Sequence, residues 1–263
     1  MPTTKLDVVI PAGGLIDGDY AAAAGTSIRA LAPVGADKKP VVQVVVDALR
    51  ASGRVGRIVV AGLPGAMPAA LGGHVLLVPE SSPEGLEGIS GGPANILAGL
   101  REVDADRIAL VCTSDLPFLT PEAVVEFIDR INVDVDVDIA GGIVSARSYN
   151  QRFADAPPSE FVNLVDEGPS TLACLFAVRP SVILGKMGLV SSVFEARKSQ
   201  WGMVRLLGLK LLCEFATKRL SAESIRRRLE QLLDCRIDLV DEAPAEAAFD
   251  VDTLEDYLYS CKQ

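Results

Sequence analysis

Short apolar runs alternate with amphipathic segments along the first half of the chain. The runs have the length of β-strands and lie at Leu6–Ile10, Arg57–Ala61, Val75–Val78 and Arg107–Cys112. The segments between them show helical periodicity and lie at Val41–Ser52, Pro93–Arg101 and Pro121–Ile131. Alternating strands and helices are typical of crossover units on a mostly parallel sheet. We therefore predict an α/β architecture for this half.

The second half of the chain has a less regular pattern. Apolar and acidic residues alternate between Val133 and Ile143, which predicts a strand near a sheet edge with one solvated face. Two short apolar runs, FVNLV and TLACLFAV, are followed by a helical region from about Pro180 to Leu233. Near the end, RIDLV and AAFDVD are expected to be strands and TLEDYLYS a closing helix. We predict one domain over residues 1–263 with a variable insertion at about 147–235.

Composition and charge exclude several classes of function. The chain has 263 residues, of which 49% are hydrophobic, so it can bury a sizeable core. It carries 25 Lys and Arg against 35 Asp and Glu, and a net charge of −10 argues against a nucleic acid partner. His74 is the single histidine, which excludes a site built on two or more imidazoles of one chain. We expect His74 and Trp201 to be structural.

The cysteines and the lengths of the apolar runs indicate the cellular compartment of the protein. The five cysteines are odd in number, widely spaced and without a CxxC motif, so we expect reduced thiols and a cytoplasmic protein. The apolar runs are too short to cross a bilayer, so no membrane association is expected. The sequence MPTTKLD also lacks the features of a signal peptide.

The first candidate for chemistry is the PAGG turn, Pro11–Gly14, directly after the first strand. Glycines at this place let backbone N–H groups approach a phosphate or a base. An ordinary turn is the alternative interpretation. Neither the dinucleotide motif GxGxxG nor the phosphate-loop motif GxxxxGK[ST] occurs there, so nucleotide binding of those two types is not supported.

Three aspartates are the second candidate. Asp115 follows the apolar strand IALVC, and a carboxylate at the carboxyl end of a central strand faces the crevice where open α/β sheets bind ligands. Its alternative role is that of a turn or helix-capping residue. Asp250 and Asp252 alternate along an expected strand, so both should point to one face, where a cation or solvent must relieve their repulsion. Asp252 as a helix cap is compatible with that role.

Five segments in this order resemble a known family. They are PAGG, Arg29–Leu49, Gly91–Leu100, Ser114–Pro117 and Phe249–Thr253. Together they resemble the nucleotidyltransferases of the molybdenum cofactor guanylyltransferase type, relatives of the sugar-1-phosphate nucleotidyltransferases. The resemblance covers nearly the whole chain. It implies a three-layer α/β/α sandwich with a mostly parallel mixed sheet of the Rossmann-like nucleotide-diphospho-sugar transferase type.

The resemblance also implies an activity and the residues that carry it. A nucleoside monophosphate would pass from a nucleoside triphosphate to a small phosphorylated or alcohol acceptor, with release of pyrophosphate. The residues matching the family's metal ligands are Asp115 and Asp252, which would hold Mg²⁺, with Asp250 as the alternative second ligand. The insertion at about 147–235 would lie on the acceptor side. The residues matching the nucleotide-binding segments are Ala12, Gly13, Gly14, Gly91, Gly92 and Asn95.

The glycine loop departs from the family pattern. Family members have a compact loop, AGGxSxRxG, followed by a lysine, whereas this chain continues as LIDGDYAAAAGTSI and has Arg29 where the lysine is expected. We predict that Arg29 contacts the α- or β-phosphate, since a guanidinium binds phosphate oxygens bidentately. Arg29 could instead tether the loop to an acidic neighbour. Because Leu15–Thr26 shows no apolar periodicity, we expect it to be mobile without ligand.

Two alternative functions follow from these observations. A catalytically inactive nucleotide-binding or regulatory protein could retain the fold after loss of the family's glycine loop. The run DVDVD, with Asp134, Asp136 and Asp138, resembles the Asp-x-Asp metal site of glycosyltransferases. That pair should end the central strand, where this chain has Ser114 and Asp115, so we interpret DVDVD as a solvated strand face.

Overall fold

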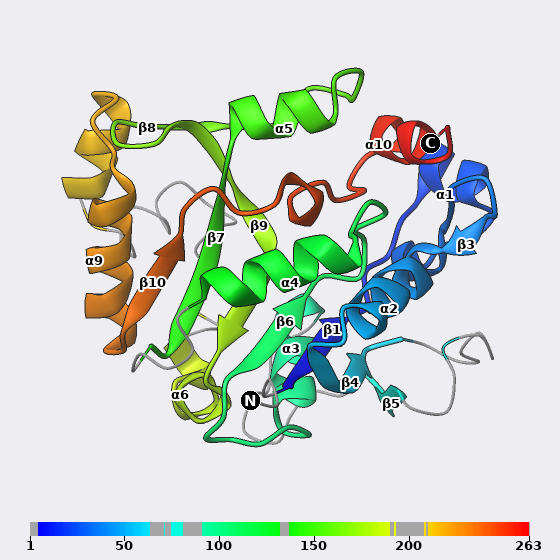
Figure 1. Cartoon of the computed structure of the whole chain (residues 1–263), viewed down its shortest axis with the longest axis horizontal. Helices are drawn as coiled ribbons and strands as arrows, with labels where there is room; N and C mark the ends of the chain where they lie inside the picture. The colour runs from blue at the N-terminus through cyan, green and yellow to red at the C-terminus, as the bar shows by residue number, and fades with distance from the viewer. Residues whose placement is uncertain are drawn as a thin grey trace.

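A mixed, mostly parallel sheet organises the computed structural model (Figure 1), which describes residues 5–63, 71, 75–80, 91–131, 137–189, 192, 208 and 210–262. In the described part the strand order is β10-β7-β9-β6-β1-β4-β5, and β8 pairs with β9. Strand β9 is antiparallel to its neighbours, and the other pairs along this path are parallel. The strands are β1 (Leu6–Pro11), β4 (Val55–Ala61), β5 (Val75–Val78), β6 (Ala109–Cys112), β7 (Ile139–Ser145), β8 (Val162–Leu164), β9 (Gly168–Val178) and β10 (Ile237–Val240).

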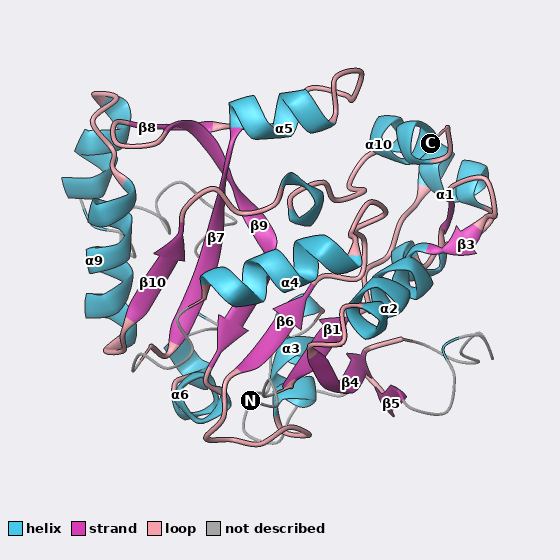
Figure 2. Ribbon diagram, in the orientation of Figure 1, coloured by secondary structure: helices cyan, strands magenta, loops and turns pink. Residues whose placement is uncertain are grey.

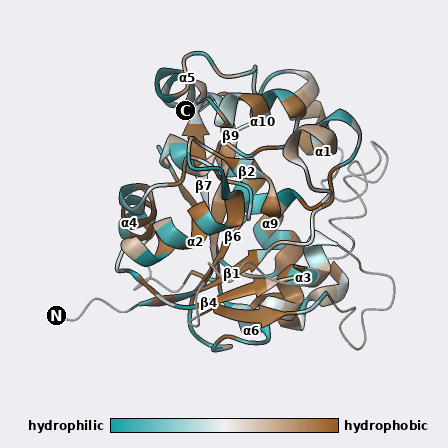
Figure 3. Cartoon of the chain, turned by 90° about the vertical axis from the view of Figure 1, so that its right-hand side faces the viewer, coloured by the Kyte–Doolittle hydropathy of each residue, from teal (hydrophilic) through white to brown (hydrophobic). Residues whose placement is uncertain are grey.

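Helices cover both faces of this sheet. Figure 3 shows α2 (Val41–Ala51) and α4 (Pro121–Arg130) on one side of the strands and α3 (Gly92–Leu100) on the other. Successive residues of β1 point to opposite faces, so Val8 and Ile10 pack in the core under α2 and α4. Val9 packs in a second core with Leu100 of α3 and with α6 (Pro180–Gly185). The prediction of a three-layer α/β/α sandwich with a mostly parallel sheet is confirmed.

Polar side chains cap the starts of two helices. Thr120 caps α4 by accepting a hydrogen bond from the backbone N–H of Ala123 at 3.1 Å, and Pro121 takes the first helical position. Ser221 caps α9 (Ala222–Leu233) in the same way, through the N–H of Ser224. The remaining short elements are η1 (Arg29–Leu31), β2 (Pro33–Val34), β3 (Lys39–Pro40), α5 (Ala146–Arg152) and η3 (Ala245–Ala247).

The strand expected at Val133–Ile143 begins later than predicted. Strand β7 starts at Ile139, and its residues from Ala140 to Val144 are buried, so it has no solvated face. The reason is that apolar groups cover both faces, since Ala140 and Val144 pack in the main core and Ile143 packs in a separate cluster with Leu220. Strand β7 is also paired along both edges, by β9 and β10. Asp134 and Asp136 lie outside the described residues.

The segment AAFDVD is not a strand, contrary to the prediction. Its first residue, Ala247, ends η3, and the rest is an irregular stretch that leads to α10 (Leu254–Ser260), drawn as a loop in Figure 2. Its backbone has a partner outside the sheet, since the N–H of Val251 donates to the carbonyl of Asp115 at 3.1 Å. Buried Phe249 and Val251 anchor the stretch, and Thr253 caps α10 in a capping box with Asp256.

The extended glycine loop contains a helix that the sequence reading missed. Residues Gly18–Ala24 form α1, and Leu15 pairs with Ile28 across the base of the segment. Tyr20 and Ala24 are buried at the i, i+4 spacing of one helix face, and buried Ile16, just before the helix, continues the same spacing. This periodicity was missed from the sequence, and the expected mobility of Leu15–Thr26 without ligand stays a prediction.

Three further expectations concern the chain as a whole. In the described part, no helix combines the length and the apolar character needed to span a bilayer. The five cysteines, all of them described, are unpaired. The single domain with an insertion at about 147–235 stays a prediction.

Candidate active site

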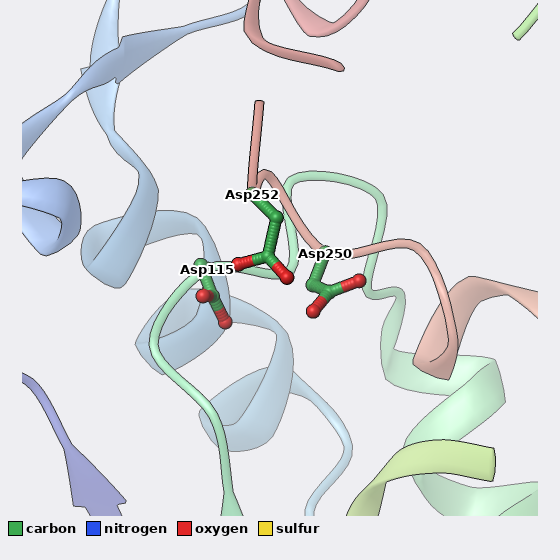
Figure 4. A group of neighbouring side chains, drawn as sticks. All are labelled: Asp115, Asp250 and Asp252. Carbon is green, nitrogen blue, oxygen red and sulfur yellow. The ribbon is translucent and has the colours of Figure 1, made fainter. Parts of the chain in front are cut away.

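Three carboxylates meet at the carboxyl edge of the sheet. Asp115 lies in the loop after β6, and Asp250 and Asp252 lie in the irregular stretch before α10. One carboxylate oxygen from each lies within 4.8 Å of the other two, and Figure 4 shows the side chains converging from the two segments. The hydrogen bond between Val251 and Asp115 holds these segments together. We call this group the acidic cluster.

Burial makes the acidic cluster electrostatically demanding. Asp115 is 8% exposed, and its Oδ1 has no hydrogen-bond partner. Burial raises the pKa of the Asp115 carboxyl, and the nearby Thr113 side chain and then the Arg29 guanidinium oppose that shift. Burial, then Asp252, then Asp115 raise the pKa of Asp250 to about 7. A cation placed among these groups would therefore be strongly stabilised.

Arg29 supplies a cation to the acidic cluster. One guanidinium nitrogen, Nη1, contacts Asp115 Oδ2 at 3.2 Å and also contacts Asp252 Oδ1. Burial disfavours the charged guanidinium, but Asp252 and Asp115 outweigh it and raise the pKa of Arg29. This geometry matches the tether that was the alternative role for Arg29. Its predicted contact with phosphate stays a prediction.

Helix α1 fixes the acidic stretch from the other side. The hydroxyl of Tyr20 donates to the carbonyl of Val251 at 3.3 Å, between the two aspartates of that stretch. The Tyr20 ring also packs on Tyr257 of α10, with centroids 5.2 Å apart. Sequence reasoning missed Tyr20, although its spacing to Ile16 and Ala24 was the available signal.

The predicted nucleotide-binding residues gather beside the acidic cluster. Gly13, after β1, and Gly62, after β4, lie against Asn95 of α3, so that a Cβ at either glycine would come within 2.4 Å of its amide. Asn95 is fully buried, and neither its Nδ2 nor its Oδ1 has a hydrogen-bond partner. Gly14 lies alongside Arg29, and a Cβ built on Gly14 would lie 3.7 Å from the Cβ of Arg29. The structure thus joins the PAGG turn to both Asn95 and Arg29.

Gly91 and Gly92 border open space at the start of α3. A Cβ at either position would meet no heavy atom within 4 Å among the described neighbours. Gly91 has φ of 69°, a left-handed conformation that favours glycine, and precedes the first turn of the helix. Backbone N–H groups at a helix start can bind anions, and among the described residues no side chain covers this turn.

Comparison with known proteins decides the family. Residues 9–153, more than half of the 263-residue chain, match the MobA-like NTP transferase domain. The chain belongs to the MobA-like NTP transferase family. The match includes the PAGG turn, Arg29, Asn95 and Asp115, whereas Asp250 and Asp252 come from outside it. None of the curated proteins matches the sequence at a significant level.

Several solved structures share the fold of this MobA-like protein. A hypothetical transferase from Thermus thermophilus is 25% identical, with a TM-score of 0.79, and the similarity covers 96% of this chain and 99% of that chain. The 2-C-methyl-D-erythritol 4-phosphate cytidylyltransferase of Francisella tularensis is 11% identical, with a TM-score of 0.52 and coverage of 97% and 98%. A CMP:2-keto-3-deoxy-manno-octonic acid synthetase complexed with CTP is 13% identical, with a TM-score of 0.51 and coverage of 90% and 89%.

Asp138, the described member of the rival Asp-x-Asp run of this MobA-like protein, is not part of the acidic cluster. Of its three aspartates, Asp138 is described, and it forms an ion pair with Arg179 at 3.0 Å. Ile139, the residue after Asp138 and the first of β7, pairs with Val178 of β9. Ala109, the first residue of β6, pairs with the same Val178. Asp138 therefore lies at the opposite end of the sheet from Asp115. His74 and Trp201, expected to be structural, lie outside the described residues.

Proposed function

We propose that this protein is a Mg²⁺-dependent nucleotidyltransferase. It would transfer a nucleoside monophosphate from a nucleoside triphosphate to a small phosphorylated or alcohol acceptor. The observation that carries the proposal is the acidic cluster, with a buried Asp115 that has an unpartnered oxygen, beside two glycine turns at the carboxyl edge of the sheet. Membership of the MobA-like NTP transferase family supports the same reaction class.

The residues of the acidic cluster fit Mg²⁺. Carboxylate oxygens are its preferred protein ligands, and one or two suffice because the ion keeps several waters and binds substrate phosphates. Asp115 and Asp252 would hold it, and Asp250 lies close enough to replace either as a ligand. When bound, the ion would neutralise charge on the triphosphate and on the oxygens that gain charge during transfer.

The remaining residues would bind and orient the two substrates. Backbone at Ala12–Gly14 and at Gly91–Gly92 would carry the nucleoside, because the glycines leave room for close approach. The acceptor oxygen would attack the α-phosphorus, the bond to the bridging oxygen would break, and pyrophosphate would leave. Arg29 would stabilise charge on the phosphates during this step. The relative complexed with CTP supports a triphosphate as the donor.

A thermal-shift screen tests the donor. Each of ATP, GTP, CTP and UTP is added with Mg²⁺ or with EDTA. One of them should raise the Tm only with Mg²⁺, and a ligand at about 100 times its Kd stabilises by about 2.7 kcal/mol. Asp115→Asn should abolish this shift, since the amide keeps the shape and loses the charge. Asp129→Asn, the same change in an ion pair with Arg54 away from the site, is the matched control. No Tm shift with any triphosphate would contradict the proposal.

An inactive nucleotide-binding protein is the second candidate. The position of Arg29 favours it, because a guanidinium fixed between Asp115 and Asp252 could replace the metal permanently. For such a protein, the triphosphate would raise the Tm by the same amount with Mg²⁺ as with EDTA. It would also release no pyrophosphate when incubated with the triphosphate, Mg²⁺ and a panel of phosphorylated and alcohol acceptors. The enzyme would show the opposite result in both assays.

A further inference from the structure

We infer that Arg29 is a displaceable counter-ion that makes metal and triphosphate binding depend on each other. In the ligand-free protein it occupies the cation position of the acidic cluster, and it leaves that position for the triphosphate phosphates when the metal enters with them. The protein would therefore bind the metal–triphosphate chelate and would bind the free metal ion weakly. This inference rests on the proposed function, because it concerns the same site and substrate.

The first support is that Arg29 and a metal ion would compete for the same oxygens. Nη1 of Arg29 contacts both Asp115 Oδ2, at 3.2 Å, and Asp252 Oδ1. A Mg²⁺ ion lies about 2.0–2.1 Å from its ligands, so an ion held by both carboxylates would overlap the guanidinium position. Either the ion or the guanidinium can lie between them at one time.

The second support is that Arg29 leaves the site incompletely satisfied. One guanidinium faces three carboxylates within 4.8 Å of one another, which leaves an excess of negative charge that a divalent cation can neutralise. Asp115 Oδ1 and Arg29 Nε are both buried and without a hydrogen-bond partner. Buried polar atoms without partners destabilise an arrangement, and here they lie on both members of the ion pair.

The third support is that the Arg29 side chain can reach the phosphate position from where it stands. Its backbone N–H donates to the carbonyl of Gly14 at 2.9 Å, and its side chain passes alongside that glycine. The Asp252 side chain is 58% exposed, so solvent can replace the guanidinium at that contact. Rotation of the Arg29 side chain alone would redirect its donors from the carboxylates to phosphates over the PAGG turn.

Metal binding without nucleotide provides the decisive test. The full chain is titrated with Mn²⁺, and free Mn²⁺ is followed by electron paramagnetic resonance. Arg29→Gln should bind Mn²⁺ at least about tenfold more tightly than wild type, because the charged group that competes with the ion for the Asp115 and Asp252 oxygens is removed. Arg54→Gln is the matched control, since Arg54 also pairs with an aspartate and has a buried Nε without a partner. Its Mn²⁺ affinity should equal that of wild type.

Triphosphate binding should change in the opposite direction. In the presence of Mg²⁺, Arg29→Gln should bind the triphosphate selected by the thermal-shift screen at least about tenfold more weakly, because a charge-assisted contact is lost. Arg29→Lys keeps the charge but lacks the planar fork of a guanidinium. Its Mn²⁺ affinity and its triphosphate affinity should both lie between those of wild type and Arg29→Gln. Adding Asp252→Asn to Arg29→Gln should remove the gain in Mn²⁺ affinity and so locate that gain in the acidic cluster.

Each outcome decides the inference. Tighter Mn²⁺ binding with weaker triphosphate binding supports it, and Mn²⁺ affinity equal to or below that of wild type overturns it. If Arg29→Gln is unstable without metal, the rise of its Tm with Mn²⁺, compared with that of wild type, gives the same comparison. If wild type binds no triphosphate, the proposed function fails, whereas the Mn²⁺ titration still reports on Arg29.

Discussion

Two buried polar side chains lie at the same edge of the sheet and are held in different ways. Asn95 is neutral, fully buried and enclosed by the backbones of Gly13 and Gly62. Asp115 is 8% exposed and is surrounded by charged groups, with Arg29 as its ion-pair partner. Both have side-chain atoms without a hydrogen-bond partner. Steric fit therefore holds Asn95 in place on one side of the site. The balance of charge holds Asp115 in place on the other side.

The largest effect should come from crowding the Asn95 side. Gly62 has φ of 85°, and a Cβ there would lie 2.1 Å from the Asn95 amide nitrogen. Gly62→Ala should therefore lower the free energy of unfolding by about 3 kcal/mol, through backbone strain and overpacking. Gly92→Ala, where the Cβ meets open space, should change it by less than about 0.5 kcal/mol. Urea unfolding of both variants measures this, and equal losses would show that fit does not govern this side.

A smaller effect of opposite sign is expected from removing the buried amide. Asn95→Leu replaces two unpartnered polar atoms by apolar ones of similar volume, so the free energy of unfolding should rise by about 1 kcal/mol. If Asn95 serves the nucleotide, the variant should at the same time lose its thermal shift with triphosphate and Mg²⁺. Asn150→Leu, at an exposed position of α5, is the control and should change neither quantity. A clear loss of stability in Asn95→Leu would mean that the amide has a partner in solution.

The charged side can be tested through its support from α1. Tyr20→Phe removes the hydrogen bond to the Val251 carbonyl and leaves that carbonyl without its donor. The expected loss in free energy of unfolding is about 1 kcal/mol, and Mn²⁺ affinity should change along with it because Val251 lies between Asp250 and Asp252. Thermal unfolding and Mn²⁺ titration provide the two measurements. Unchanged Mn²⁺ affinity with lowered stability would limit Tyr20 to a structural role.

The smallest effect is expected at an exposed charge away from both sides. Hydrogen bonds from Arg226 and Arg227 lower the pKa of Glu223 to about 2. A lowered pKa in the folded state stabilises above the unfolded value, near pH 4.5, and this stabilisation is lost as pH falls through about 2. Glu223→Gln should therefore be slightly less stable than wild type at pH 7 and equal to it near pH 2. The triphosphate affinity of Glu223→Gln should equal that of wild type. This variant therefore serves as a reference for the variants near the site.

Periodicity and capping predicted the elements that are stabilised locally. Strand β5 and helices α2 and α4 lie within a residue of their expected bounds, because apolar spacing and caps such as Thr120 are readable in the chain itself. The acidic cluster was also expected in outline, since Asp115 and Asp252 were predicted to approach one another and do so.

Features that depend on distant contacts were not predictable in this way. Helix α1 is short and rich in alanine, and its buried face is stabilised by segments more than 200 residues away along the chain. The Tyr20 ring packs on Tyr257 of α10, and the Tyr20 hydroxyl donates to the Val251 carbonyl in the stretch before α10. The stretch at Asp250 and Asp252 has the alternation of a strand, but its Val251 N–H pairs with a loop carbonyl and not with a neighbouring strand. The enclosure of Asn95 requires helix α3 to meet the turns at Gly13 and Gly62, which no spacing in the sequence records.

Strand β9 has a consequence for synthesis of the protein. It fills the gap between β6 and β7, and its register pairs Leu175 with Cys112 and Val178 with Ala109. A nascent chain that has emerged only through residue 153, the end of the family match, lacks this strand. It would then expose a buried, apolar edge at Ala109–Cys112, and such edges promote aggregation. Productive folding on the ribosome therefore depends on the arrival of Gly168–Val178.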